Sequence, residues 1–204
     1  MSRRQQPMKT LIVTGGIGSG KSLVCSYLAS QGIPVYDSDS RAKALYYENP
    51  LIVTDLEKAL GASLRDAAGT FDRHRLGDLI FSDPGKLAKV EEIIHPLVFE
   101  DFLGWRNDRF DEAPFVVMES AIFLEKPIFH PLADVILLVD APVQIRLQRV
   151  RLRDGSAPEA ILKRMDAQHF DPSKVDAVIE NDEDIAALYR RVDEAMEMLK
   201  SKLF

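Results

Sequence analysis

The sequence predicts an α/β protein with a parallel five-stranded sheet in a three-layer arrangement, an inserted helical substrate domain and a small helical lid. Two observations support this prediction: short apolar runs alternate with longer helical patterns, and the spacing between the runs is uneven. Almost uninterrupted apolar runs are expected of parallel strands that are buried on both faces. Helices that alternate with such strands cover the two faces of the sheet.

Five short segments rich in β-branched residues are the predicted strands. They are Thr10–Thr14, Pro34–Tyr36, Phe115–Met118, Val135–Val139 and Ala177–Ile179. Ahead of the first strand, Met1 to Pro7 are polar and contain no apolar segment typical of a signal peptide. We expect these residues to form a disordered leader.

The long interval after the second strand predicts an insertion. About 75 residues separate the second and third strands, far more than one helix and its loops require. Helical patterns there cover Ser38–Glu48, Leu51–Leu60, Leu76–Phe81 and Pro84–Phe110. We therefore expect a nucleotide-binding core of residues 9–37 and 112–204 and a helical, acceptor-binding insertion of residues 38–111. A smaller excursion within the core, residues 142–170, contains two basic helices joined at Asp154–Pro158 and is the expected lid.

The segment Gly15 to Ser22 carries the most specific motif, because it matches G-x-x-x-x-G-K-[ST] between a predicted strand and a helix that ends at Gly32. Glycines let the backbone curl so that its N–H groups point at phosphate oxygens, and the helix N-terminus adds a partial positive charge. In such a loop, Lys21 contacts the β- and γ-phosphates and the Ser22 hydroxyl is a ligand of Mg²⁺. A chance glycine-rich turn or a dinucleotide loop is the alternative, but neither requires Lys-Ser in this register.

Two carboxylates, Asp37 and Asp39, follow the second predicted strand. Because the carboxyl ends of parallel strands share one edge of the sheet, we expect both beside the phosphate loop. A kinase that acts on a hydroxyl needs a carboxylate to orient that group and accept its proton. Asp39 is the candidate base, and Asp37 is expected to bind a Mg²⁺-bound water or the acceptor. Capping of the following helix by Asp37 or Ser38 is an alternative role.

The first basic helix of the excursion places Arg146, Arg149 and Arg153 at helical spacing on one face. Arg164 follows on the next helix, whereas Arg151 is expected to face solvent. Phosphoryl transfer needs positive charge around the transferring group, and arginine suits that task better than lysine. We therefore expect lid arginines here, of which Arg149, Arg153 and Arg164 are the stronger candidates. A solvated charged face is the alternative.

Composition excludes several classes of function. The net charge of −6 argues against a nucleic-acid-binding protein. No apolar run is long enough to span a membrane. The single Cys25 cannot form an internal disulfide and fits a reducing cytoplasm. No sequence feature indicates an obligate protein partner.

Taken together, the motifs resemble the dephospho-CoA kinase family. The resemblance rests on TGGIGSGKS in the phosphate loop, the Asp37-x-Asp39 pair, His95-Pro96-Leu97, the run from Pro142 through Arg149 to Arg153-Asp154, Ala167-Gln168, and Val178-Ile179-Glu180-Asn181. Their order and spacing agree from Lys9 onward. The resemblance implies phosphorylation by ATP of the ribose 3′-hydroxyl of dephospho-CoA, which gives CoA and ADP in the last step of coenzyme A synthesis.

The resemblance also implies roles for individual residues. The loop residues Gly16, Ile17, Gly18, Ser19, Gly20, Lys21 and Ser22 would hold ATP and Mg²⁺, and Asn181 would lie near the adenine. Asp39 would be the base, Arg149 and Arg153 would be lid arginines, and His95 would help to shape the acceptor pocket. Together with the chemistry argued above, this makes Lys21, Asp39, Arg149 and Arg153 the expected catalytic residues and Asp37, His95 and Arg164 the expected acceptor-binding residues. A locally satisfied, buried histidine is the alternative for His95, and a kink is expected at Pro96.

The chain departs from the family pattern at three places: Leu23 follows Ser22, Ala121 replaces a proline, and Glu183 replaces a glycine. Another small-molecule kinase of this fold, acting on a nucleoside monophosphate or shikimate, is the closest alternative, although the long insertion favours a large acceptor. A regulatory GTPase would need N-K-x-D after a strand, and Ile179-Glu180-Asn181-Asp182 lacks the lysine.

Overall fold

A computed structural model describes residues 8–168 and 170–204, so the predicted leader Met1–Pro7 lies outside the described residues. By contacts between Cα atoms, the chain divides into two compact units. The first unit contains the chain up to Asp37 together with Trp105–Phe204, and the second contains Ser38–Gly104. Over the described ranges, no helix is long and apolar enough to cross a membrane.

Five parallel strands form the sheet of the first unit, in the order β2-β3-β1-β4-β5. They are β1 (Lys9–Thr14), β2 (Val35–Asp37), β3 (Phe115–Glu119), β4 (Val135–Asp140) and β5 (Ala177–Glu180). All five predicted strands are present, each extended or shifted by one residue. Pro34 lies just outside β2 because it has no N–H to donate to the sheet, although its carbonyl accepts from Val117 N–H at 2.9 Å. The predicted parallel α/β fold is confirmed.

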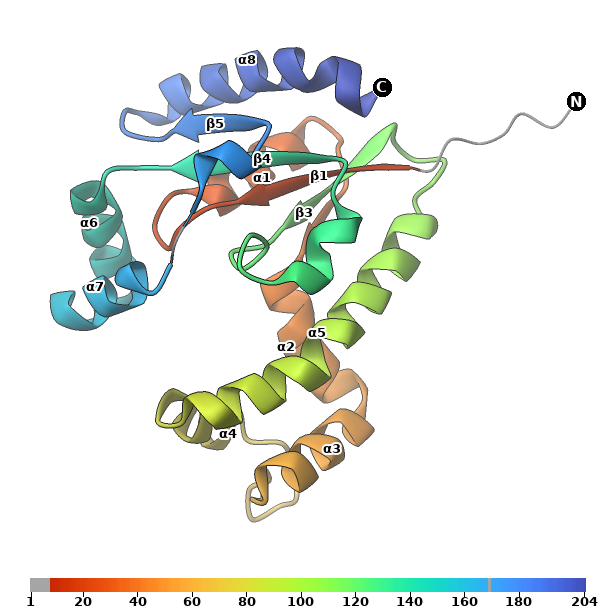
Figure 1. Ribbon diagram of the computed structural model, residues 1–204, viewed down its shortest axis with the longest axis vertical. Coiled ribbons are helices and arrows are strands. Elements are labelled where there is room, and N and C mark those ends of the chain that lie inside the picture. The colour runs from red at the N-terminus through yellow and green to blue at the C-terminus, as the bar shows by residue number, and fades with distance from the viewer. Residues whose placement is uncertain (1–7, 169) are drawn as a thin grey trace, which may run out of the picture. The chain divides into compact units, whose positions relative to one another are not determined.

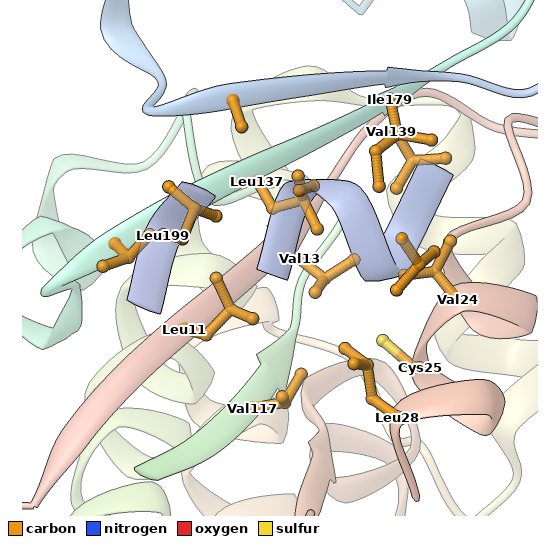
Figure 2. Packing of buried hydrophobic residues seen from close by; sticks show 14 of the residues in the cluster. Leu11, Val13, Val24, Cys25, Leu28, Val117, Leu137, Val139, Ile179 and Leu199 are labelled. Atoms are coloured by element: carbon orange, nitrogen blue, oxygen red, sulfur yellow. The ribbon is translucent and has the colours of Figure 1, made fainter. Parts of the chain in front are cut away.

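The helices of the first unit lie along this sheet and beyond one end of it (Figure 1). They are α1 (Lys21–Ser30), α6 (Val143–Asp154), α7 (Pro158–Asp166) and α8 (Ile185–Leu203), with short 3₁₀ helices at Pro127–Leu132 and Pro172–Lys174. Helices α1 and α8 pack on one face, where alternate strand residues such as Leu11, Val13 and Leu137 meet Val24 and Leu199 in one buried cluster (Figure 2). The intervening residues Ile12 and Val116 are fully buried on the opposite face, as expected of strands covered on both sides.

The second unit is helical, as predicted for the insertion. Its helices are α2 (Ser38–Glu48), α3 (Pro50–Leu60), α4 (Arg73–Phe81) and α5 (Pro84–Asn107), the last of which runs on into the first unit. Capping explains why α3 and α4 begin earlier than the apolar pattern predicts. The Asn49 side chain accepts from Leu51 N–H, and that of Asp72 accepts from His74 N–H. Helix α5 continues through Pro96, which donates no hydrogen bond to the preceding turn.

Truncating the centre of the sheet should destabilise the protein strongly. Leu11 lies on the central strand β1 with no exposed surface, so Leu11→Ala is expected to lower the free energy of unfolding by about 2–5 kcal/mol. Leu152→Ala is the matched control, because that side chain is 79% exposed. Urea denaturation followed by circular dichroism measures both, and equal losses would contradict the assignment of Leu11 to the core.

Candidate active site

The phosphate loop, Gly15–Ser22, leaves the end of β1 and enters α1. Gly20 precedes the first residue of α1 with a φ of +102°, and a Cβ there would lie 2.1 Å from Asn181 Nδ2. Only glycine fits both the left-handed backbone and the close approach of this neighbour. Among the described residues no side chain caps α1, and its first turn contains no acidic residue. The N-terminus of α1 is therefore suited to binding an anion.

Two side chains of the motif lie at the start of α1. Lys21 Nζ donates to the carbonyl oxygen of Gly16 at 3.2 Å, which holds the ammonium group over the loop. Ser22 Oγ donates to Glu119 Oε1 at 2.7 Å. The motif residues thus have the local arrangement expected for phosphate and cation binding, whereas their roles stay predictions.

Glu119 is a candidate site residue that the sequence analysis did not select. It ends β3, and the strand register aligns it with Val13 of β1 on one side and Asp37 of β2 on the other. Strand β3 lies between β2 and β1, so Glu119 lies between Asp37 and the strand that leads into the phosphate loop. A carboxylate directly after a buried strand was the available signal.

The electrostatic environment of Glu119 is unusual. Burial raises the pKa of this carboxyl group, opposed by the hydrogen bond from Ser22, and the negative charge of Asp37 raises it further. Cys25 lies beneath it. Burial is the main cause that raises the pKa of this thiol, and the negative charge of Glu119 is the second. Two neighbouring carboxylates favour a bound cation, which would relieve their mutual repulsion. No cluster of three or more His, Cys, Asp or Glu side chains suited to a metal occurs in the part of the chain that the structure describes.

Asp39 and His95 belong to the second unit. Asp39 is exposed in the first turn of α2, and His95 is half-buried in α5, directly before Pro96. Arg41 joins these helices, since its guanidinium donates to Asp101 Oδ1 at 2.8 Å and to Glu48 Oε1 at 3.0 Å. The hydrogen bond to Asp101 is the main cause that raises the pKa of Arg41. This network fixes the helix that carries Asp39, and the base and acceptor roles of Asp39 and His95 stay predictions.

The predicted arginines of α6 and α7 occupy different environments. Arg149 donates to the carbonyl and side-chain oxygens of Asn181, at 3.0 and 3.2 Å. Arg153 forms a paired hydrogen bond with Asp154, at 2.6 and 3.0 Å, and its side chain is 62% exposed. Arg164 lies 3.8 Å from the same aspartate. These hydrogen bonds and the Arg153 charge hold the pKa of Asp154 below its usual range.

Arg146, ranked below those three in the sequence analysis, is the arginine that contacts the phosphate loop. It is 8% exposed, and its Nε donates to the carbonyl oxygen of Ile17 at 2.9 Å. The three arginines of the predicted face therefore lie in different environments. Its N-terminal member is buried against the loop, and its C-terminal member is open to solvent.

Asn181 connects the end of β5 to the phosphate loop. Its Nδ2 donates to the carbonyl oxygen of Ser19 at 2.7 Å, and its backbone N–H donates to Asp140 O at 2.7 Å. Arg149, Asn181 and Ser19 therefore form a continuous chain of hydrogen bonds. Beyond it, Arg191 forms ion pairs with Asp182 and with Glu183, the residue at one departure from the family pattern. The predicted adenine contact of Asn181 stays a prediction.

Sequence comparison supports the resemblance across most of the chain. A family model described as dephospho-CoA kinase matches residues 10–187. Dephospho-CoA kinase of Porphyromonas gingivalis is 43% identical over 166 residues, which cover 81% of this chain and 80% of that protein. The enzyme of Chlorobaculum tepidum is 37% identical over 195 residues, which cover 92% and 93%.

Structural comparison agrees with the fold, and the solved structures below 25% identity bear on the fold alone. TT1252 of Thermus thermophilus superposes with a TM-score of 0.79 at 30% identity, covering 98% of this chain and all of that one. Dephospho-CoA kinase of Campylobacter jejuni gives a TM-score of 0.67 at 21% identity, with 96% and 98% covered. A shikimate kinase of Acinetobacter baumannii gives 0.54 at 17% identity, with 97% and 96% covered, and shares the fold alone. With its phosphate loop and a family match over most of its length, the chain belongs to the dephospho-CoA kinase family.

Proposed function

We propose that this chain transfers the γ-phosphoryl group of ATP to the ribose 3′-hydroxyl of dephospho-CoA, which gives CoA and ADP. The observation that carries the proposal is a complete phosphate loop at the end of β1, in a chain whose family match spans residues 10–187. The reaction breaks the bond between the γ-phosphorus and its bridging oxygen and forms a bond to the ribose oxygen. The hydroxyl proton passes to a base on the protein.

On the nucleotide side, Gly16 to Ser22 would hold the phosphates. Backbone N–H groups at the start of α1 would donate to phosphate oxygens, and Lys21 would exchange its bond to Gly16 O for the β- and γ-phosphates. Such groups accelerate phosphoryl transfer because they are already in place when charge develops on the transferring group. Asn181 would border the base of the nucleotide from its position behind Ser19.

The oxygen atoms beside Ser22 fit Mg²⁺. This cation prefers hydroxyl, carboxylate and phosphate oxygens and retains several waters. Ser22 Oγ would be its direct protein ligand, and Glu119, which now accepts from that hydroxyl, would accept from a cation-bound water together with Asp37. Bound there, Mg²⁺ neutralises phosphate charge.

On the acceptor side, Asp39 would orient the ribose hydroxyl and take its proton. The unit Ser38–Gly104 would bind dephospho-CoA with the help of His95, while Asp37 and Arg164 would contact the acceptor from the core and the lid. Residues 142–170 would act as the lid and bring Arg149 and Arg153 to the transferring group. Closure of a lid excludes water, which would otherwise accept the phosphoryl group.

ATP and dephospho-CoA are then small-molecule partners, and neither nucleic acid, a membrane nor an obligate protein is required. Cys25 is a buried free thiol in the core beneath the phosphate loop. Free thiols persist in reducing compartments, so we place the chain in the cytoplasm.

An ADP-release assay across acceptors tests the proposed function. We expect dephospho-CoA to support turnover and CoA to appear in equal amount, while shikimate and nucleoside monophosphates support none beyond the rate with water. A preference for one of those other acceptors would replace dephospho-CoA as the substrate without changing the reaction class. ATP hydrolysis that no acceptor stimulates would contradict a kinase altogether.

Removal of the Arg153 side chain should affect turnover more than binding. Arg153→Ala is expected to lower kcat by about tenfold while the KM for ATP stays within about twofold, because a lid arginine acts mainly in the transition state. Arg151→Ala, an exposed change on the same helix, is the matched control. A change in KM alone would assign Arg153 to substrate positioning.

The carboxylate of Glu119 should make stability depend on pH. Because its pKa is raised in the folded chain, folding favours the protonated form; this stability is present below the unfolded pKa and is lost as pH rises through the folded pKa. Glu119→Gln mimics the protonated form. Its melting temperature is therefore expected to exceed that of the wild type at pH 7, with a smaller difference at pH 4. If Glu119→Gln were less stable than the wild type at both pH 7 and pH 4, the hydrogen bond from Ser22 would stabilise the carboxylate more than burial destabilises it.

A further inference from the structure

The two-helix excursion, residues 142–170, holds one residue of the phosphate loop, Ile17, from three directions. Arg146 Nε donates to its carbonyl oxygen at 2.9 Å. Gln168 Oε1 accepts from its N–H at 2.8 Å. The Ile17 side chain packs against the buried cluster of Val150, Ile161 and Met165. Both backbone hydrogen-bonding groups and the side chain of Ile17 thus have their partners in the excursion.

The position of Arg146 is difficult to explain by stability alone. The residue is only 8% exposed, and its Nη2 has no hydrogen-bond partner among the described residues. A Cβ on Gly16 would lie 2.2 Å from this Nη2, so the guanidinium fills the space against the loop backbone. Burying a charged group with an unsatisfied donor is unfavourable, and an apolar side chain of similar size is often neutral or stabilising. Burial also lowers the pKa of Arg146, which Asp140 opposes.

We propose that Arg146 and Gln168 are positioning residues that hold the Ile17 peptide, and through it the phosphate loop, in the conformation that binds nucleotide. The inference rests on the proposed function only for the identity of the nucleotide, ATP or ADP. A loop that adopts its binding conformation for only part of the time binds with an affinity reduced by that fraction. The excursion then has two roles, because it also supplies lid arginines.

Two substitutions of similar volume test the proposal. Arg146→Met and Gln168→Met remove one hydrogen bond each from Ile17 while they keep an unbranched side chain. Arg151→Met and Gln148→Met are the matched controls, because both positions are exposed on α6. Calorimetric titration of ADP is expected to give about tenfold weaker binding for each test variant, if the competent fraction falls to a tenth, and values within about twofold for the controls.

Two further readouts separate positioning from a merely structural role. The melting temperature of ligand-free Arg146→Met should equal or exceed that of the wild type, since a buried charge has been removed. The Ile17 amide should exchange its hydrogen faster in Gln168→Met than in the wild type or in Gln148→Met, because it has lost its acceptor. In the double variant the two losses of ADP binding free energy should be less than additive, since both substitutions act on the Ile17 peptide.

Several results would overturn the proposal. Unchanged ADP affinity in both test variants would show that Ile17 does not limit binding. Tighter binding in Gln168→Met would show that Gln168 competes with phosphate for the Ile17 N–H. Failure of dephospho-CoA to support turnover would refute the proposed function, but it would leave the ADP titration and the hydrogen exchange as valid tests of this inference.

Discussion

Asp39→Asn is expected to lower kcat by about 10²–10⁴-fold, the range for loss of a general acid–base group. Asparagine keeps the size and the hydrogen-bonding capacity of the side chain but cannot accept the ribose proton. Asp39 lies in the first turn of α2, outside the loop Gly15–Ser22 that would hold the phosphates. The affinity for ATP should therefore remain within about twofold of the wild-type value, so that the loss appears in turnover.

Asp55→Asn is the matched control for this change, because Asp55 is exposed on α3 and forms an ion pair at 3.2 Å with Lys58 of the same helix. Single-turnover measurements should show the slow step in phosphoryl transfer itself. A nearly normal kcat for Asp39→Asn would exclude Asp39 as the base. Asp37, which ends β2, would then be the next carboxylate to test.

The fold was largely predictable because most strands have a recognisable local sequence pattern. The central strands β1, β3 and β4 are short, mostly buried apolar runs, whereas in the edge strand β5 alternate residues such as Val178 are exposed. Helical patterns separate these runs. The last helix, Ile185–Leu203, was not among the predicted elements, although Asp184 caps it and apolar residues such as Leu188, Val192 and Leu199 recur at helical spacing. These signals are of the same kind as those that predict the helices of the insertion.

The site was less predictable, because two of its features depend on tertiary structure. The order of strands in a sheet cannot be read from local patterns, and it is this order that places Glu119 between Asp37 and Val13. Helical spacing puts Arg146 and Arg153 on one face but does not say where a neighbouring element covers that face. The phosphate loop covers only the Arg146 end, so one arginine is buried and the other is 62% exposed.

Lys21→Met should produce the second large loss. Methionine preserves most of the apolar stem of lysine and removes only the ammonium group, which lies over the loop at 3.2 Å from Gly16 O. With ATP bound, the ammonium group would contact the β- and γ-phosphates and stabilise the negative charge that develops there during transfer. Removing a preorganised donor of this kind lowers kcat by about 10²–10³-fold.

Lys163→Met on α7 is the control for Lys21→Met, since it removes an exposed ammonium group at another place in the same unit. Lys21→Arg refines the interpretation. It keeps the positive charge but replaces a compact ammonium with a wide planar group, which the tight loop cannot place equally well. Activity in Lys21→Arg close to that of Lys21→Met would show that the geometry of the ammonium group matters as much as its charge. If Lys21→Met retained nearly full turnover, the loop would bind phosphate through its backbone alone, and the developing charge would have to be balanced by Mg²⁺ and the lid arginines Arg149 and Arg153.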